Sequence, residues 1–310
     1  MIDLVVPVLF LGLGIVLLTI SSNKTVDHSI ALACNWKVPP ILIGLVLVSI
    51  GTDLPEILNS IFSSSLGHGN INVGDSIGSA FAQLTLVLGI TALSLKQFKV
   101  NRKEVFAIGA ATLLALILSF FSIEDGYISR INGFFLIISW FLFILIIKTI
   151  TEKEFSCPPA PKRSVRNFIM LVLGFVGVAV GTYMVINAIL ELTRIFNISE
   201  LIASFFIAAV GTSLPELAVT ITAIRKGQHA LAIGDIMGSS LVDASLSIGI
   251  GPLLFPTIVS GESAIATLFY TIFAVLIVVV ILSLRGKVDK KVGIICLSLY
   301  LFSYGLLFLS

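Results

Sequence analysis

The chain has 310 residues, of which 57% are hydrophobic and only 12% are charged, and its net charge is +2. Soluble domains normally carry about 25% charged residues. The composition therefore excludes an ordinary soluble enzyme or nucleic-acid-binding domain and predicts an all-α membrane protein. Three cysteines, Cys34, Cys157 and Cys296, are widely spaced without a CxxC pair, which predicts buried thiols rather than a disulfide framework or a zinc site.

Ten apolar runs are long enough to cross a bilayer, whose core needs about 20 apolar residues per helix. The N-terminal run has no basic residues before it, so we expect it to stay as a span rather than be removed as a signal peptide. In chain order the predicted spans are residues 4–20, 38–65, 71–95, 104–121, 128–149, 167–192, 200–225, 231–254, 264–284 and 291–309.

Basic residues indicate the orientation of these spans. With ten spans, one side of the membrane would hold only Arg130 and Arg194, and the other would hold the remaining 17 of the 19 lysines and arginines. Cytoplasmic loops are enriched in lysine and arginine. The split predicts a multi-pass protein of the cell membrane with both termini outside.

The sequence also contains an internal repeat. Residues 41–90 align with residues 201–250 without gaps, and 14 of the 50 positions are identical. Five spans per half is an odd number, so the second copy would be inverted, as in many secondary transporters. We therefore predict a first five-helix repeat (1–150), a short cytoplasmic linker (151–166) and a second, inverted repeat (167–310).

The first repeated motif reads Gly-Thr-Asp-Leu-Pro-Glu at residues 51–56 and Gly-Thr-Ser-Leu-Pro-Glu at residues 211–216. A proline inside a span removes a backbone hydrogen bond, and the residue before it disfavours helical geometry. The motif predicts breaks in helices 2 and 7 that free carbonyl groups. Asp53 with Glu56, and Ser213 with Glu216, also fit capping boxes for the restarting half-helices, which is the purely structural alternative.

The second repeated motif places oxygen atoms along one helical face. Asp75, Ser79 and Gln83 are spaced four residues apart, and so are Asp235, Ser239 and Asp243. The glycines beside them, at positions 74, 78, 234 and 238, predict close helix packing. For Asp75 and Asp235 an N-cap at the start of a helix is the alternative explanation.

Six of the 17 acidic residues fall inside both a predicted span and the internal repeat, and the basic residues of the repeat, Arg225 and Lys226, lie only at the end of a span. Ionisable groups inside a membrane are costly and indicate function. Carboxylates, hydroxyls, an amide and freed carbonyls are the hard oxygen ligands that calcium takes, and the absence of histidine and cysteine from the set disfavours soft transition metals. The six acids are Asp53, Glu56, Asp75, Glu216, Asp235 and Asp243.

The two motifs resemble the alpha repeats of the calcium/cation antiporter family, specifically its sodium/calcium exchanger branch. The resemblance is strong over 41–90 and 201–250 and topological elsewhere. It implies a secondary antiporter that exchanges sodium for calcium by alternating access, with no cofactor and no catalysis.

The resemblance also implies roles for individual residues. Glu56 and Glu216 would be the central calcium-binding carboxylates, with Gln83 and Asp243 beside them. Flanking sodium sites would be formed by the hydroxyls of Thr52, Thr212, Ser79 and Ser239 and by the backbone carbonyls of Ser49 and Ala209. The long, charge-poor helices 1 and 6 would slide.

Three acids depart from the family pattern. Asp53 occupies a position where serine is usual and Ser213 is its family-like partner, whereas Asp75 and Asp235 replace asparagine. The additional carboxylates leave open a potassium requirement, proton coupling or a different divalent metal. Remoter alternatives are an intramembrane aspartyl protease using Asp75 and Asp235, and a passive cation channel.

Overall fold

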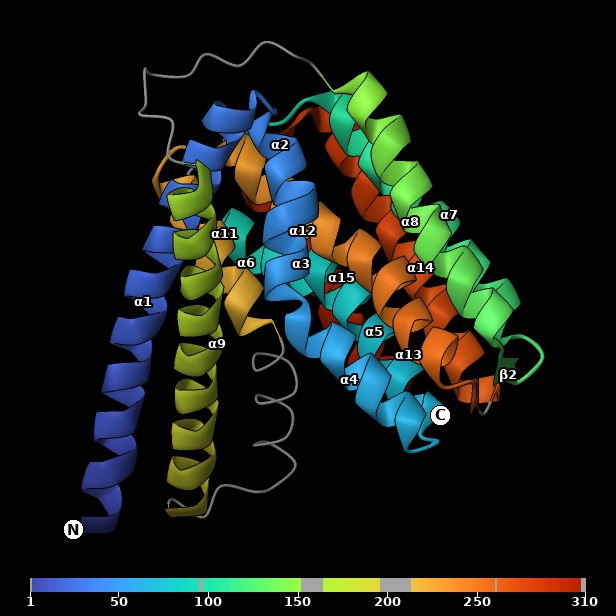
Figure 1. Cartoon of the computed structure of the whole chain (residues 1–310), viewed down its shortest axis with the longest axis horizontal. Helices are drawn as coiled ribbons and strands as arrows, with labels where there is room; N and C mark the ends of the chain where they lie inside the picture. The colour runs from blue at the N-terminus through green and yellow to red at the C-terminus, as the bar shows by residue number, and fades with distance from the viewer. Residues whose placement is uncertain (1, 95–96, 152–163, 196–212, 260, 308–310) are drawn as a thin grey trace.

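The computed structural model describes residues 2–94, 97–151, 164–195, 213–259 and 261–307. Almost all of this chain is helical, and the helices form a layered bundle (Figure 1). The helices are α1 (Ile2–Trp36), α2 (Pro40–Ile43), η1 (Gly44–Val48), α3 (Ser49–Thr52), α4 (Leu54–Ser65), α5 (Gly69–Ala82), η2 (Gln83–Val87), α6 (Leu88–Ser94), α7 (Arg102–Ile123), α8 (Arg130–Ile150), α9 (Ser164–Ile195), α11 (Leu214–Arg225), α12 (His229–Val242), η3 (Asp243–Ser247), α13 (Ile248–Leu254), α14 (Gly261–Arg285) and α15 (Lys290–Leu307). The three η segments are single π-helical turns within longer helices.

Seven of the described helices are long and apolar enough to cross a membrane. An eighth span is the bent pair formed by Pro40–Thr52 and Leu54–Ser65, whose two parts meet at 49°. The predicted seventh span is described only from residue 213 onward, and α15 lies where the tenth was predicted. The protein is therefore an all-helical, multi-pass membrane protein.

The first helix is longer than the sequence indicated. We predicted a span over 4–20 followed by a loop, but α1 continues to Trp36 and includes Lys24 and His28. At about 1.5 Å per residue its 35 residues extend well beyond a bilayer core of about 30 Å. His28 is half-buried, and its Nδ1 lies 3.2 Å from Asn167 Oδ1 of α9.

The cysteines only partly follow the prediction. Cys296 is buried with a free thiol. Cys34, near the end of α1, is disulfide-bonded, and its partner lies outside the described residues. The expectation of buried free thiols is therefore wrong for Cys34.

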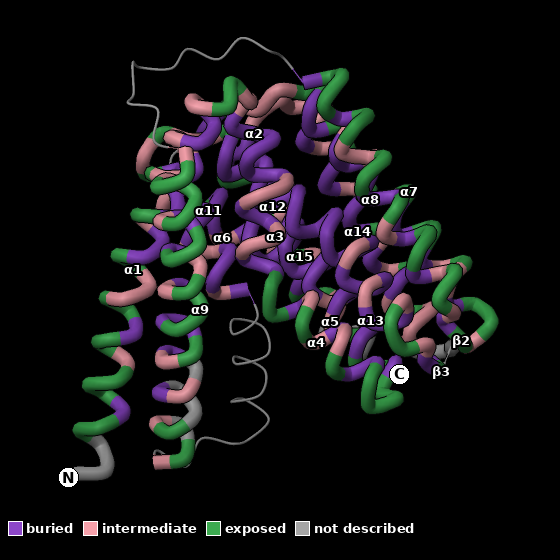
Figure 2. Tube along the Cα trace, in the orientation of Figure 1, coloured by how far each residue is buried: buried purple, intermediate pink, exposed green. Residues whose placement is uncertain are grey.

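Two long helices, α1 and α9, lie side by side at one edge of the bundle (Figure 1). Their contact is the most extensive between any two described elements, and it uses glycines: a Cβ at Gly177 would lie 2.1 Å from Ser21 Oγ, and one at Gly181 would lie 2.8 Å from Leu18 N. The rest of the first half of α1 is mostly exposed (Figure 2), whereas its second half also buries residues such as Val26 and Leu32. These two helices form a peripheral pair.

Helix α12 occupies the opposite environment, in the middle of the bundle. Its trace is almost entirely buried in Figure 2, and it packs against α2 and η1 of the first half. A Cβ at Gly234 would lie 2.2 Å from the carbonyl oxygen of Ile41, so only glycine allows this approach. The prediction of close packing holds for Gly234 and Gly238, whereas no described atom would lie within 4 Å of a Cβ at Gly74 or Gly78.

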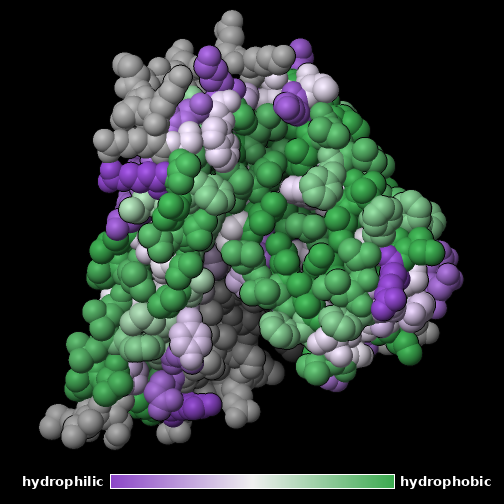
Figure 3. Space-filling model, viewed as in Figure 1, coloured by the Kyte–Doolittle hydropathy of each residue, from purple (hydrophilic) through white to green (hydrophobic). Residues whose placement is uncertain are grey.

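Two short antiparallel ladders, which the sequence did not predict, join loops of the two halves. Strand β1 (Phe98–Lys99) pairs with β4 (Lys287–Val288), and β2 (Tyr127–Ile128) pairs with β3 (Thr257–Ile258). The face drawn in Figure 3 is mostly apolar, and its polar residues gather toward the ends of the bundle, as expected for a surface in contact with lipid.

Candidate cation site

The bend in the second span falls at Asp53, between α3 and α4. Asp53 has non-helical backbone angles (φ −83°, ψ 8°), while Leu54, which we expected to leave the helical region, is the first residue of α4. Pro55 has no N–H, so the carbonyl of Gly51 loses its helical partner. The predicted break of helix 2 is therefore present, one residue earlier than expected.

The capping explanation for the first motif is not supported. Asp53 and Ser213 both stand at the N-cap position of their half-helices, α4 and α11, but neither side chain hydrogen-bonds to a backbone N–H of the following turn. Asp53 is fully buried, and neither of its carboxylate oxygens has a hydrogen bond of ordinary geometry; the same is true of Ser213 Oγ. These side chains are thus directed to something other than capping.

Three carboxylates converge at this break. Asp53, Glu56 and Glu216 each offer an oxygen, and the three oxygens lie within 4.8 Å of one another. All three residues are at least 96% buried, and both oxygens of Glu216 lack a hydrogen bond. Because α4 carries Glu56 and α11 carries Glu216, the two copies of the motif meet at one point.

The second motif brings two more groups toward this cluster. Gln83 and Asp243 are the first residues of the π-helical turns η2 and η3, at matching positions of the repeat, and both are buried. Asp243 lies close enough to Asp53 and Glu56 for their charges to interact. Its Oδ1 accepts a 3.3 Å hydrogen bond from Ser247, whereas Oδ2 has none. Such π-helical turns are frequent at functional sites.

Asp75 and Asp235 are not N-caps. They lie six residues after the first residues of α5 and α12, inside the helices. Asn59 Nδ2 donates to Asp75 Oδ2 at 2.6 Å, and Thr220 Oγ1 donates to Asp235 Oδ2 at 3.0 Å. Each aspartate thus has its own neighbour on the preceding half-helix, which disfavours the shared-proton pair that an aspartyl protease needs.

Asn59 and Thr220, which hydrogen-bond to Asp75 and Asp235, were not predicted from the sequence to lie near the site. They follow the glutamates of the first motif by three and four residues, and therefore share a helical face with Glu56 and Glu216. That spacing was the available signal.

Hydroxyl groups surround the acidic cluster. Ser239 is fully buried and faces Asp53, and its Oγ has no hydrogen bond of ordinary geometry. Ser79 is also buried, on α5. Thr52 lies close to Asp235, and its Oγ1 also donates to the carbonyl of Val48 at 3.1 Å.

The predicted carbonyl ligands are less completely defined. The Ser49 carbonyl already accepts the N–H of Asp53 at 2.9 Å, and Thr52 Oγ1 donates to the same oxygen at 3.2 Å. Thr212 and Ala209 lie outside the described residues.

Among the described residues no lysine or arginine is buried with these acids, and Arg225 at the end of α11 is exposed. The sequence has no lysine or arginine between residues 38 and 95 or between 227 and 284. Burying unpaired carboxylates is costly, and it is relieved by a bound cation or proton. Carboxylate, hydroxyl and amide oxygens without histidine or cysteine suit a hard cation such as Ca²⁺ or Na⁺.

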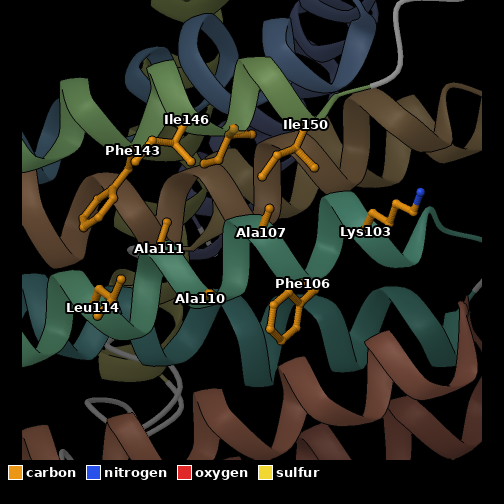
Figure 4. A pocket seen from close by; sticks show the side chains of 10 residues that line it. Lys103, Phe106, Ala107, Ala110, Ala111, Leu114, Phe143, Ile146 and Ile150 are labelled. Carbon is orange, nitrogen blue, oxygen red and sulfur yellow. The ribbon is translucent and has the colours of Figure 1, made fainter.

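A separate depression of about 400 Å³ lies between α7 and α8 and has a different character (Figure 4). Apart from Lys103 at one end, its lining is apolar and includes Phe106, Leu114, Phe143 and Ile146. It offers no oxygen ligands, so the acidic cluster is the candidate cation site.

Comparison with known proteins decides the family. Residues 6–149 and 166–309 match the sodium/calcium exchanger protein family. The chain belongs to the sodium/calcium exchanger family. The family resemblance inferred from the two motifs is thereby confirmed.

Several relatives of this exchanger-family chain match it over nearly its whole length. It is 28% identical to the putative antiporter CaxA of Alkalimonas amylolytica, over 99% of this chain and 100% of that protein. It is 26% identical to the sodium/calcium exchanger MaX1 of Methanosarcina acetivorans, over 94% and 95%. The structure of the sodium-calcium exchanger NCX_Mj soaked with zero Na⁺ and Ca²⁺ matches with a TM-score of 0.83 and 26% identity, over 98% of this chain and 99% of that one.

Proposed function

We propose that this protein exchanges sodium for calcium across the membrane by alternating access at the acidic cluster. One observation carries the proposal: Asp53, Glu56 and Glu216 place buried oxygens within 4.8 Å of one another, and no lysine or arginine is among the buried residues that the structure describes. Calcium takes six to eight oxygens and requires carboxylate charge. The names of relatives such as MaX1 support the same ions.

The ligands divide into a centre and two flanks. Glu56 and Glu216 are the proposed central ligands for calcium, with Asp243 and Gln83 completing this shell from η3 and η2. Ser79, Ser239 and Thr52 would take sodium in the flanks, and Asp75 and Asp235 line the approaches. Thr212, Ser213 and the carbonyls of Ser49 and Ala209 complete the proposed set.

The proposed architecture is ten spans in two inverted five-helix repeats (1–150 and 167–310) with breaks in helices 2 and 7. It is supported by the gap-free repeat in the sequence and by the meeting of Glu56 with Glu216. The proposed orientation puts the 17 basic residues in the cytoplasm and both termini outside the cell.

Charge supplies the proposed coupling. Calcium or several sodium ions offset the negative charge of the site, whereas the empty site keeps all of its unpaired buried carboxylates, whose passage through the low-dielectric interior is costly. Only the occupied site would switch between the two sides. The peripheral pair α1 and α9 is the proposed moving element, because it packs chiefly on itself.

Radiocalcium uptake into sodium-loaded proteoliposomes tests the proposal. Uptake should require an outward sodium gradient, and it should be lost in Glu56→Gln and Glu216→Gln, which keep the side-chain size but remove the charge. Glu124→Gln is the matched control, because Glu124 is an exposed loop residue. Normal uptake by either buried-glutamate variant would refute the proposed site.

Proton coupling is the second candidate, favoured by the additional carboxylates Asp53, Asp75 and Asp235. With the sodium gradient absent and a pH gradient imposed, a proton-coupled antiporter would still accumulate calcium. A passive channel would instead carry calcium without any counter-ion gradient.

A further inference from the structure

The two copies of the first motif differ in charge at one buried position. Asp53 and Ser213 stand at the same place in their half-helices, with nearly equal backbone angles: φ −83° and ψ 8° for Asp53, φ −97° and ψ 6° for Ser213. Both are buried and neither caps its helix. The duplicated serine shows that the local fold needs no carboxylate here.

Asp53 changes the charge that the site must balance. With Glu56, Glu216, Asp235 and Asp243 it makes five buried carboxylates, where a serine at position 53 would leave four. A single divalent ion neutralises two of them. The remaining charge is costly to bury, and within the described part of the chain no lysine or arginine is buried to offset it.

The surroundings of Asp53 offer ligands for a second ion. Ser239 Oγ and Asp235 Oδ1 are buried without a hydrogen bond, Ser239 faces Asp53, and Asp235 interacts with Asp53 electrostatically. Thr52 adds a hydroxyl beside Asp235. Two carboxylates and two hydroxyls form a hard, oxygen-only environment beside the central cluster.

We infer that Asp53 makes the site bind one monovalent metal cation more in each transport cycle than a site with serine at this position would bind. The ion is sodium or potassium, and its proposed carboxylate ligands are Asp53 and Asp235, beside the flanking hydroxyls of Ser239 and Thr52. This inference rests on the proposed antiport function and concerns how many ions that same site carries.

The coupling ratio of calcium transport tests the inference. Proteoliposomes containing the full-length protein are held at a clamped voltage and pH, and the sodium gradient at which net radiocalcium flux stops is measured with and without a potassium gradient. Asp53→Ser, which reproduces the duplicated residue, should lower the number of monovalent ions per calcium by one. If the ion is potassium, potassium dependence should disappear in the variant; if it is sodium, the sodium number should fall.

Two further variants control for misfolding and for the loss of a carboxylate elsewhere in the protein. Asp53→Asn keeps the size of the side chain while removing its charge, so it replaces Asp53→Ser if the latter does not fold. Asp125→Asn removes a carboxylate from an exposed loop and should leave the ratio unchanged. An equal ratio in the wild type and both position-53 variants would overturn the inference, as would a ratio that follows the pH gradient instead of either metal ion.

A binding measurement separates this inference from the proposed function. Equilibrium dialysis of purified protein with radioactive sodium or rubidium (as a potassium analogue) should show one more bound ion in the wild type than in Asp53→Ser, whether or not calcium is transported. Absence of sodium-driven calcium uptake would refute the proposed function. Equal ion binding by the two proteins would refute the role of Asp53.

Discussion

Helix α1 of the peripheral pair and the central helix α12 differ in hydropathy and in what surrounds them. Helix α1 belongs to a span of mean hydropathy 2.4, of which only 22% of the most apolar stretch is buried. The span His229–Leu254, which contains α12, η3 and α13, has a hydropathy of only 1.3 and 94% of its stretch buried. Lipid supplies the apolar surroundings of α1, whereas other helices surround α12.

This difference shows where polar chemistry is tolerated. Because α12 is shielded by protein on all sides, it carries Asp235, Ser239 and, at the start of η3, Asp243 without exposing them to lipid. The span with the lower mean hydropathy is therefore the one that carries residues of the candidate cation site.

The largest expected effect compares one substitution in the two regions. Gly234→Ala should destabilise the protein by about 1–3 kcal/mol, because the added methyl group overlaps the Ile41 carbonyl at 2.2 Å. Gly12→Ala in α1 meets no described atom within 4 Å and should be neutral or stabilising by up to ~1 kcal/mol. Thermal unfolding of the detergent-purified proteins measures both, and equal effects would contradict the contrast between the two regions.

Removing the charge of Asp243, at the start of η3, should change the stability of the protein and its calcium affinity in opposite directions. Asp243→Asn should weaken calcium binding about tenfold or more, roughly 1.4 kcal/mol, because ligand charge sets calcium affinity. Without ions, the same variant should be more stable than the wild type, because an unpaired buried carboxylate is gone. Calorimetric calcium titration and ion-free melting provide the two readouts. A loss of stability without ions would show that Asp243 is already satisfied by protein groups.

A paired carboxylate at the edge of the bundle should behave differently from these unpaired ones. Burial alone would raise the pKa of Asp289, but hydrogen bonds from Arg285, the Val292 N–H and Lys287 lower it to about 2. Its stabilisation is therefore complete above the usual aspartate pKa of 3.8 and is lost as the pH falls toward 2. Asp289→Asn should be less stable than the wild type at pH 6, and the gap should close between about pH 4 and pH 2 in denaturation series. A gap that persists at pH 2 would exclude this ionic origin.

The smallest effect is expected where the peripheral pair touches the core. Lys226 Nζ of the loop after α11 lies 2.6 Å from Asp27 Oδ1 of α1, but the Asp27 side chain is 65% exposed. Exposed ion pairs contribute about 0.2–1 kcal/mol and weaken with salt. A double-mutant cycle with Asp27→Asn and Lys226→Met, repeated at high salt, measures this energy. A coupling above about 2 kcal/mol would mean that the pair is firmly fixed to the core and would weigh against its movement.

The motifs pointed to the acidic cluster because their chemistry is local. Leu-Pro-Glu dictates a break wherever it occurs in a span, and its recurrence at residues 214–216 anticipated that Glu56 and Glu216 would be equivalent. The meeting of their oxygens within one cluster followed from the repeat, not from either segment alone.

What the sequence missed depends on packing between distant segments. The end of α1 was misplaced because its polar second half is stabilised by contacts with α9 and α11, as in the bond from Thr222 Oγ1 to Ser22 Oγ. The π-helical turns at Gln83 and Asp243 have no local sequence signal. The unequal surroundings of Gly78 and Gly238 likewise arise from what lies opposite each one.

The two small ladders carry a consequence for biosynthesis. Strands β1 and β2 belong to the first half of the chain, but their partners β4 and β3 lie in the second, and β4 follows β1 by about 190 residues. At about 5–20 residues per second, a ribosome needs roughly 10–40 s to deliver β4 after β1. During that interval the first half is in the membrane while its strands lack their partners. In the same way, Glu56 has no Glu216 beside it until the second motif has been made, so the acidic cluster assembles only after much of the second half has been synthesised.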